Sequence, residues 1–429
     1  GHGATPDTAQ APADHAMDMS PGPLGIPRGR EGSGTAWLPG HSPMYAHHAP
    51  FGAWELMFHE NIFVQYVQDG GDRGHEQLGS VNWFMGMARR EFAGGELGFR
   101  VMMSAEPLTV GECGYPDLLA TGEFCNGEPI VDRQHPHDLF MEVAGQYTRA
   151  LGNAVGIELY GGTVGEPALG PVAYPHRVSS LANLMAPISH HWIDATHITF
   201  GVATLGLFGR HWKVEGSLFN GREPDENRYD FDFGPFDSYS GRLTVVPTER
   251  WAIQVSGGHL EEAEAPHDVF DPRVDVDRFT ASAIHHRPIG AASLFSATLA
   301  WGRNVEEGTA TDAFLLEGAV NMAEVHEIFA RGELVEKAAH DLEIDGVEGT
   351  FRVGKATAGF LLNLGRVAGL VPGIGVSGSV SFLPAELEPA YGGANPLGFA
   401  VFVRARPAAM GMMHREDAAP GHGSGGHHP

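Results

Sequence analysis

Trp212-Lys213-Val214-Glu215-Gly216-Ser217-Leu218-Phe219 is a stretch in which two kinds of side chain alternate. The even-numbered positions hold Trp, Val, Gly and Leu, whereas the odd-numbered positions begin with Lys, Glu and Ser. Successive side chains of a β-strand point to opposite faces of its sheet. The stretch therefore predicts a strand with one apolar face and one largely polar face.

The same period of two recurs along most of the chain, with clear cases at 97–106, 139–148 and 397–404. This recurrence indicates an all-β protein, an antiparallel transmembrane β-barrel of about sixteen strands, within about 14 to 18. The expected strands cover residues 52–68, 79–91, 96–106, 138–149, 154–163, 195–206, 211–220, 238–247, 250–260, 277–286, 292–303, 312–321, 326–335, 355–365, 372–383 and 397–406.

The connections between these strands fall into two classes of length. Those after the even-numbered strands are tight turns, and those after the odd-numbered strands are mostly long. The long connections are 107–137, 164–194, 221–237, 261–276 and 336–354. Outer-membrane barrels show this asymmetry, with short periplasmic turns and long extracellular loops. A large soluble jelly-roll or propeller is the alternative, but neither explains the two different rims.

Several tryptophans lie near the expected strand ends or beside turns, where aromatic girdles of membrane barrels form. They are Trp54, Trp83, Trp212, Trp251 and Trp301. These positions predict a barrel that is surrounded by membrane lipid.

The composition favours the same fold class and limits the partners. The 429 residues include 59 Gly and 29 Pro, which disfavours long helices, and 53 Asp+Glu against 27 Lys+Arg. The resulting net charge of -26 would repel nucleic acid and favours cations as partners. Because the sequence does not begin with Met, we expect a signal peptide to have been removed from an exported protein of the bacterial outer membrane.

Three regions follow from these patterns: a flexible N-terminal tail at 1–50, a barrel at 51–406 and a flexible C-terminal tail at 407–429. Within the first long loop, Cys113 and Cys125 are spaced to close a short disulfide loop in an oxidising compartment. Two unrelated buried thiols are the alternative interpretation.

Both tails are rich in His and Met, which together suit copper because thioethers select the soft Cu(I) ion. These residues are His2, His15, Met17, Met19, His41, Met44, His47 and His48 near the N-terminus, and Met410, Met412, Met413, His414, His422, His427 and His428 near the C-terminus. The alternative is a solvated low-complexity linker in which His and Met are incidental.

A second group of candidate ligands lies in and beside the long loops. If Ile198, Phe200 and Val202 face lipid, then His197 and Thr199 face the lumen. Histidines of two loops then meet at one rim, with nitrogen and oxygen ligands for copper, zinc or another divalent ion. A hydrogen-bonded plug that holds the loops against the wall is the alternative. The predicted metal ligands are His135, His137, Asp138, His190, His191, Asp194, His197, Met410, Met412, Met413 and His414.

The segment 219–228 places three carboxylates between Arg222 and Arg228. It can form a salt-bridged loop lock or a cation-attracting mouth, and the flanking arginines favour the lock because they neutralise most of the field.

Three motifs resemble those of a poorly characterised family of bacterial outer-membrane proteins. They are Gly165-Glu166-Pro167-Ala168-Leu169-Gly170-Pro171 with His176-Arg177, then Ser189-His190-His191 to Asp194 with Thr196-His197-Ile198, and Asn220-Gly221-Arg222-Glu223-Pro224-Asp225-Glu226. The resemblance covers about residues 50–406 and is specific within 132–228. It implies a barrel, and it implies copper through an association of such proteins with copper-handling genes.

These observations predict a non-enzymatic barrel that binds or passes copper or a similar transition-metal ion, with a periplasmic metal-handling protein as an expected partner. A general cation-preferring porin with structural histidines is one alternative. A membrane-embedded hydrolase that uses a hydroxyl such as that of Ser189 is another, although no nucleophile motif supports it.

Overall fold

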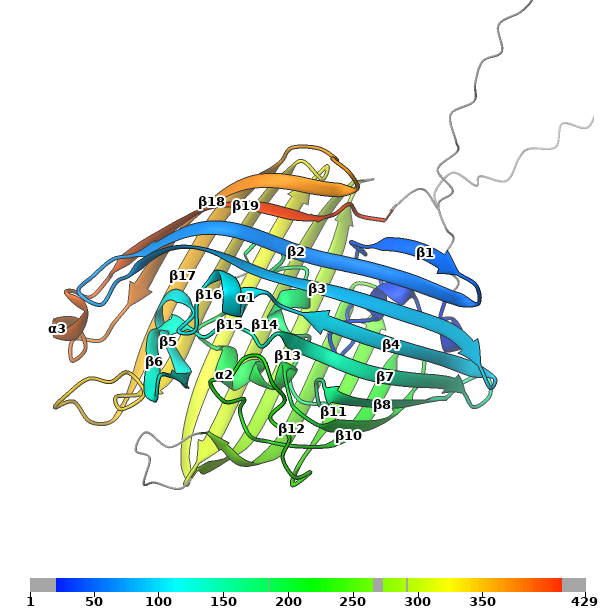
Figure 1. The fold of residues 1–429 in the computed structure, drawn as a ribbon, viewed down its shortest axis with the longest axis horizontal. Helices are drawn as coiled ribbons and strands as arrows, with labels where there is room; N and C mark the ends of the chain where they lie inside the picture. The colour runs from blue at the N-terminus through cyan, green and yellow to red at the C-terminus, as the bar shows by residue number, and fades with distance from the viewer. Residues whose placement is uncertain (1–20, 184, 265–272, 291, 411–429) are drawn as a thin grey trace, which may run out of the picture.

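The computed structural model describes residues 21–183, 185–264, 273–290 and 292–410. Within these ranges, sixteen antiparallel strands close into one barrel, as the alternation predicts (Figure 1). The strands are β2 (Trp54–Asp69), β3 (Glu76–Phe92), β4 (Gly95–Met103), β7 (Phe140–Ala150), β8 (Gly156–Val164), β9 (Val202–Phe208), β10 (Trp212–Phe219), β11 (Ser238–Thr248), β12 (Trp251–Glu264), β13 (Val274–Ile289), β14 (Ser293–Glu306), β15 (Thr309–Met322), β16 (His326–Ala338), β17 (Thr350–Asn363), β18 (Leu370–Phe382) and β19 (Leu397–Pro407).

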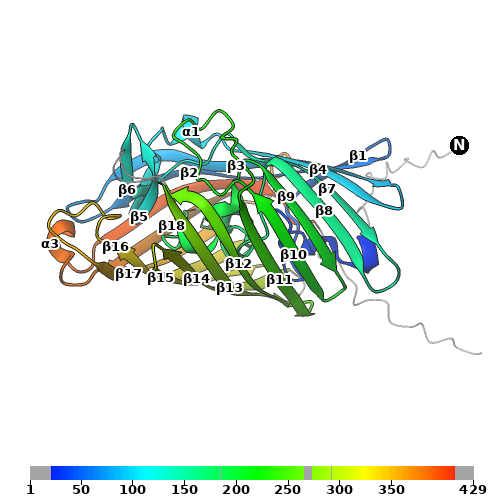
Figure 2. The ribbon, with the colours of Figure 1, turned by 90° about the horizontal axis from the view of Figure 1, so that it is seen from below.

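Each barrel strand pairs with the next along the chain, and β19 pairs with β2, for example Val403 with Val64. This last pairing closes the sheet, so its backbone groups are hydrogen-bonded between strands with no open edge. Figure 2 shows β9 to β12 side by side in the wall. The short strand β1 (His47–Phe51) pairs with β2, outside this ring.

The wall separates an apolar exterior from a largely polar interior. Along β10, the side chains of Trp212, Val214 and Leu218 are exposed, whereas Lys213 and Glu215 are buried. An apolar outer face can lie in hydrocarbon only if the strands satisfy their own backbone groups, as a closed barrel does. Among the described residues, no helix is both long enough and apolar enough to cross a membrane.

The two rims differ in the way that the connection lengths predict. The turns β3–β4 and β7–β8 lie at one end, and the hairpin of β5 (Tyr115–Cys125) and β6 (Glu128–Gln134) lies toward the other (Figure 1). Short helices occupy the long connections: α1 (Glu106–Thr109), α2 (His190–Ile193) and α3 (Glu388–Tyr391).

The connection from β8 to β9 folds into the lumen. Its described residues, 165–183 and 185–201, include Arg177 and Tyr174, neither of which has exposed surface, and helix α2 packs against β13, β14 and β15. We call this connection the inserted loop. It occupies the middle of the barrel, so the lumen is a packed interior over much of its length.

The prediction of a flexible N-terminal tail is wrong for residues 21–50. This segment forms short 3₁₀ turns at Pro23–Gly25 and Arg28–Arg30 and places Ala36 and Leu38 in a buried cluster with Val172. Its polar groups meet barrel partners, and Arg30 pairs with Glu249 at 2.7 Å. Composition alone suggested low order, but the lumen supplies the buried surface that offsets the chain entropy.

The C-terminal boundary also moves slightly. Strand β19 ends at Pro407, Ala409 forms a bridge with Tyr45, and the backbone N–H of Met410 donates to the carbonyl of Met44 at 2.8 Å. The remaining tail residues, 1–20 and 411–429, lie outside the described part of the chain.

The strand predicted at 195–206 is shorter in the structure, and several of its apolar side chains face the interior where the prediction placed them against lipid. Residues Ala195–His197 form a 3₁₀ turn, and β9 begins at Val202. Ile198, Phe200 and Val202 are all buried in the interior, not turned to lipid. Trp83 likewise lies in the interior, not in a girdle. The reason is that the inserted loop builds an apolar core inside the barrel, so an apolar side chain does not mark the lipid face.

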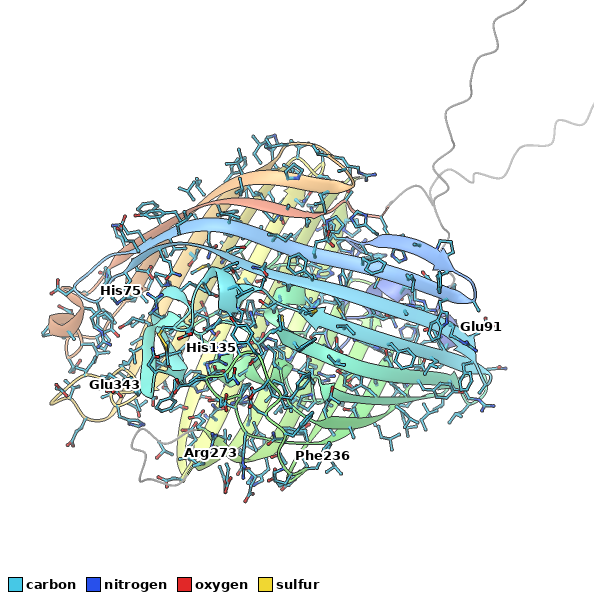
Figure 3. The ribbon with its side chains drawn as sticks, in the orientation of Figure 1. His75, Glu91, His135, Phe236, Arg273 and Glu343 are labelled. Carbon is cyan, nitrogen blue, oxygen red and sulfur yellow. A yellow bond between two sulfur atoms is a disulfide. The ribbon has the colours of Figure 1, made fainter. Side chains whose placement is uncertain are left out.

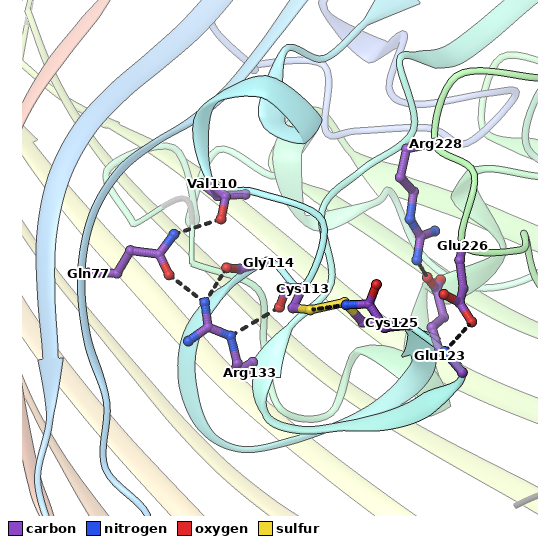
Figure 4. Close-up of a disulfide and its surroundings, with 11 residues drawn as sticks. Gln77, Val110, Cys113, Gly114, Glu123, Cys125, Arg133, Glu226 and Arg228 are labelled. Atoms are coloured by element: carbon purple, nitrogen blue, oxygen red, sulfur yellow. Dashed lines mark hydrogen bonds and ion pairs between the residues drawn. A yellow bond between two sulfur atoms is a disulfide. The ribbon is translucent and has the colours of Figure 1, made fainter.

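The predicted disulfide between Cys113 and Cys125 is present, with a Cα–Cα distance of 5.3 Å. It joins the two ends of the segment that carries β5, and Arg133 from β6 donates to the carbonyl of Cys113 at 3.1 Å (Figure 4). The pairing therefore ties the β5–β6 hairpin to itself above the lumen.

We expect the C113S/C125S variant to lose order in the hairpin while the barrel stays folded. The chain-entropy model assigns about 3 kcal/mol to a loop of this length. Limited proteolysis should cut the variant near residues 113–127 faster than the wild type, with equal resistance to unfolding by heat in SDS gels. Equal cutting of both proteins would contradict this role.

The buried side chain of Glu166, in the inserted loop, makes the stability of the folded barrel depend on pH. Burial raises the pKa of Glu166 from 4.5 to about 8, although Arg242 acts in the opposite direction. Between pH 4.5 and about 8, Glu166 keeps its proton in the folded chain but loses it in the unfolded chain. The free energy of unfolding therefore falls as the pH rises through this range.

We expect E166Q to unfold at a higher temperature than the wild type at about pH 8.5 and to match it at about pH 4.5. A gel assay of heat unfolding tests this, with E226Q, in the exposed part of another loop, as the control; a gap of equal size at both pH values would refute it.

Candidate metal centre

Five histidines converge inside the barrel, as the sequence predicts for the loop histidines. His135 and His137 follow β6, His190 and His191 lie on α2, and His197 ends a 3₁₀ turn. The ring centroids of neighbouring histidines are 5.1 to 6.4 Å apart. Figure 3 shows His135 beside the β5–β6 hairpin, within the outline of the barrel. Two connections far apart in sequence therefore supply one histidine cluster.

Four of these imidazoles are held by their Nδ1 atoms. His190 meets Asp194 Oδ1 at 2.8 Å, and His191 meets Glu223 Oε1 at 3.1 Å. His197 meets the carbonyl of Asp194 at 2.8 Å, and His135 meets the carbonyl of Pro136 at 3.3 Å, with a carboxylate oxygen of Glu123 3.2 Å away. A hydrogen bond from Nδ1 fixes the tautomer and leaves Nε2 as an acceptor, which is the arrangement of metal-binding histidines.

Three of the opposite nitrogens have no hydrogen-bond partner among the described residues. The Nε2 atoms of His135, His191 and His197 are buried without a hydrogen bond. A buried polar atom without a partner carries a desolvation cost, and such atoms commonly mark a water or ion site. These three nitrogens, together with His190, are the candidate ligand set.

His137 differs from the other four histidines. Its Nδ1 meets Glu106 at 2.9 Å, and its Nε2 meets the hydroxyl of Tyr174 at 3.1 Å. Burial alone would lower the pKa of His137, but Glu106 raises it above the ordinary value. Both ring nitrogens already have partners, so the geometry suits His137 to a structural role.

Asp194 acts as the anchor of the cluster. Its Oδ2 accepts from the backbone N–H of Tyr174 at 2.8 Å and from Arg177 at 2.5 Å, while Oδ1 faces His190. Arg177 also donates to Glu317 of β15 at 2.7 Å. Although burial opposes ionisation, Arg177 and the hydrogen bond from His190 lower the pKa of Asp194, so it stays charged. One aspartate therefore joins the histidines to the barrel wall.

Electrostatics favour neutral imidazoles in this place. Burial lowers the pKa of His190 to about 4, and burial also lowers the pKa values of His135 and His197 well below 6.5. Burial raises the pKa values of Asp138 and Glu123 to about 7. The uncharged imidazole is the form that coordinates a metal, so these histidines are competent ligands at neutral pH.

The histidine cluster encloses a small cavity of about 30 Å³, the share of one water molecule in the liquid. Its nitrogens do not form a closed ligand set. Within the described ranges, the groups of three or more ligand atoms lying within 4.8 Å of one another are found elsewhere, at His259, Glu261 and Asp275 and at Asp225, Asp230 and Asp232. Side-chain rotation of the imidazoles would be needed for several of them to hold one ion.

The acidic segment after β10 forms the loop lock. Arg222 pairs with Glu262, Arg228 pairs with Glu123 of the hairpin, and the backbone N–H of Gly127 donates to Glu226 at 2.9 Å (Figure 4). Glu223 points inward to His191 instead. This loop thus closes over the histidine cluster and contributes one of its carboxylates.

The structure does not bring the tail ligands to this centre. Met410 lies at the end of β19 beside Met44, and Met412, Met413 and His414 lie outside the described residues. Sequence reasoning missed Glu106, Glu123 and Tyr174, which hold the histidines. Glu106 and Glu123 come from the first long loop, where charge alone gave no signal, whereas Tyr174 lies two residues before the His176-Arg177 motif.

No protein-family model and no curated protein matches the chain. Solved structures of similar shape include an anion-selective porin from Comamonas acidovorans, at 10% identity and a TM-score of 0.49, covering 82% of this chain and 99% of the porin. OmpF of Salmonella typhi in complex with daunomycin matches at 8% identity and a TM-score of 0.49, covering 84% and 100%. A loop L8 deletion mutant of OmpT from Vibrio cholerae matches at 10% identity and a TM-score of 0.48, covering 82% and 99%. These similarities concern shape and assign no activity.

A closed antiparallel barrel with an apolar exterior and a charged interior is the architecture of bacterial outer-membrane proteins. The chain is therefore an antiparallel β-barrel protein of the bacterial outer membrane. The resemblance to a copper-associated family stays a prediction.

We expect D194N to loosen the inserted loop. The variant removes one of the two carboxylates that face the buried guanidinium of Arg177, and breaking a buried ion pair costs about 3 to 5 kcal/mol. Heat unfolding in SDS gels should shift to lower temperature, and protease should cut within residues 165–201. D225N, an exposed aspartate of the loop lock, is the control. An unfolding temperature of D194N equal to that of the wild type would contradict the anchoring role.

Proposed function

We propose that this barrel binds a divalent transition-metal ion, copper or zinc, at the histidine cluster and passes it across the outer membrane. The observation that carries the proposal is the set of three buried Nε2 atoms without partners, each on a ring whose Nδ1 is held by an oxygen. Imidazole nitrogen suits copper and zinc, and the oxygens that hold the rings raise the basicity of the ligands.

A route from the loop rim to this cluster supports passage. A larger cavity of about 360 Å³ shares Glu123, His191 and Glu223 with the histidine cavity. It adds the carboxylates of Glu264 and Glu306. Carboxyl groups crowded at a channel mouth attract cations when they are ionised, and a bound cation in turn favours their ionised form. A cation drawn into this acidic vestibule would meet the histidines next.

The acidic vestibule equally favours the second candidate function, a general cation-preferring porin. The inserted loop and the N-terminal segment 21–46 occupy the lumen, which favours a selective path over a wide one. The two functions differ in what the histidines do, and an experiment on the histidines separates them.

The structure gives a hydrolase little support at the serine that the sequence singled out. The hydroxyl of Ser189 donates to Glu333 at 2.8 Å, so its partner is a carboxylate and not the imidazole of the common serine triads.

The test is the H190N/H191N variant of the full chain, titrated calorimetrically with Cu(II) and Zn(II). Asparagine keeps polarity but removes two imidazoles, so we expect affinity to fall about tenfold or more. The matched control is H285N/H286N, an adjacent pair at the other end of the barrel on β13. The tails are identical in all three proteins and contribute equally.

Conductance in planar bilayers completes the test. We expect Zn(II) to reduce the conductance of the wild type and of H285N/H286N, because a bound ion occupies the path, and to leave H190N/H191N unaffected. If metal affinity and block are the same in all three proteins, the metal function is refuted and the general porin is preferred.

A further inference from the structure

A second cavity, of about 100 Å³, lies between the N-terminal segment, strands β2 and β3, and the inserted loop. Its wall carries four thioethers, those of Met44, Met57, Met85 and Met87, and two imidazoles, those of His59 and His176. We call it the methionine chamber. It shares no lining residue with the histidine cluster.

The strand register creates this chamber. Met57 of β2 is the cross-strand partner of Met87 on β3, and His59 is the partner of Met85. Met85 in turn is opposite Met102 of β4. Cross-strand partners place their Cβ atoms about 4.5 to 5.5 Å apart on one face. Four thioethers and one imidazole therefore lie on the inner face of three neighbouring strands.

The inserted loop brings a further imidazole against this face. The Nε2 of His176 lies 3.3 Å from the sulfur of Met102, and the rings of His59 and His176 are 6.0 Å apart. Trp83 lies beside both histidines, with its ring 5.2 Å from that of His59 and 4.9 Å from that of His176. Nitrogen, sulfur and an aromatic face thus meet in one place.

Methionine often serves only as a flexible filler of apolar gaps. A filler would not require an imidazole with an unused nitrogen, yet the Nε2 of His59 is buried without a hydrogen-bond partner. The nearby oxygen of Asn61 is also buried without a partner. Unpaired polar atoms inside a cavity otherwise lined by thioethers and apolar groups indicate a bound ligand. Methionines that only filled space would not need them.

The charges around the chamber leave room for a small cation. Arg28 pairs with Glu96 and with Glu31, and the guanidinium of Arg406 stacks 3.7 Å above the ring of Tyr45. The two arginines of the wall, Arg28 and Arg406, are matched in number by Glu31 and Glu60, which also line the chamber, and the Trp83 face attracts cations. Thioether sulfur favours soft ions such as Cu(I), whereas hard ions such as Mg²⁺ prefer oxygen ligands.

We propose that the methionine chamber binds a soft monovalent coinage-metal ion, Cu(I) or Ag(I), through thioether sulfur with His59 or His176. This site is separate from the histidine cluster and does not rest on the function proposed for it. The backbone N–H of Met410 donates to the carbonyl of Met44 in the chamber wall.

Equilibrium dialysis of the full chain against Ag(I) tests the proposal, with M57L/M85L as the variant. Leucine keeps nearly the same volume, so the barrel should stay folded while two sulfurs are lost. We expect the variant to bind one Ag(I) fewer per chain than the wild type. The control M141L/M322L changes two methionines that do not line the chamber, and it should bind as the wild type does.

Two further measurements locate the ion. Anomalous diffraction from wild-type crystals grown with Ag(I) should show a peak beside Met57, Met85 and His59, which keeps the proposal testable if the leucine variant fails to fold. Zn(II) binding should be unchanged in M57L/M85L, and Ag(I) binding in the chamber should be unchanged in H190N/H191N. Equal Ag(I) binding by the wild type and M57L/M85L, or an anomalous map with silver only at other positions, would overturn the proposal.

Discussion

The interior of this barrel depends on one buried cation with two anionic partners. Arg177 has no exposed surface and is held between Asp194 of the inserted loop and Glu317 of the wall. Because a buried charge is tolerated only when it is fully paired, the loop cannot leave the wall without a large cost. The same Asp194 orients His190 and His197. The positions of the candidate ligands are therefore a consequence of how the loop is anchored.

This anchoring divides the lumen into regions of different chemistry. Toward the long loops lie carboxylates and anchored imidazoles, such as Glu223 and His191, which suit borderline divalent ions. Toward the short turns lies the methionine chamber, with cross-strand pairs such as Met57 and Met87, which suits soft ions. A lumen that served only as a water-filled pore would need neither arrangement, since polar side chains of any kind would line it.

The sequence predicted the wall well and the interior less well. Alternation in stretches such as 212–219 fixes strand and facing, because a period of two has one structural meaning when one face meets lipid. It failed at Ile198 and Phe200, where the inserted loop provides an apolar surface inside the barrel. The convergence of His135 with His190 was predicted from the rim on which their loops lie. Their anchoring by Glu123 and Asp194 was not, since those contacts join residues far apart in sequence or within an irregular turn.

The same reasoning explains why the methionine chamber is hard to see in the sequence. Met57, Met85 and Met102 each occupy an ordinary inward position of an alternating strand. In the sequence, any other apolar residue at such a position would give the same pattern. Their meaning appears only when the register places them opposite one another and the loop adds His176. Register and loop insertion are long-range properties, set by barrel closure and by the Arg177 network and not by local pattern. The strand pattern thus determines the barrel wall, and the buried ion pairs determine which side chains meet in the lumen.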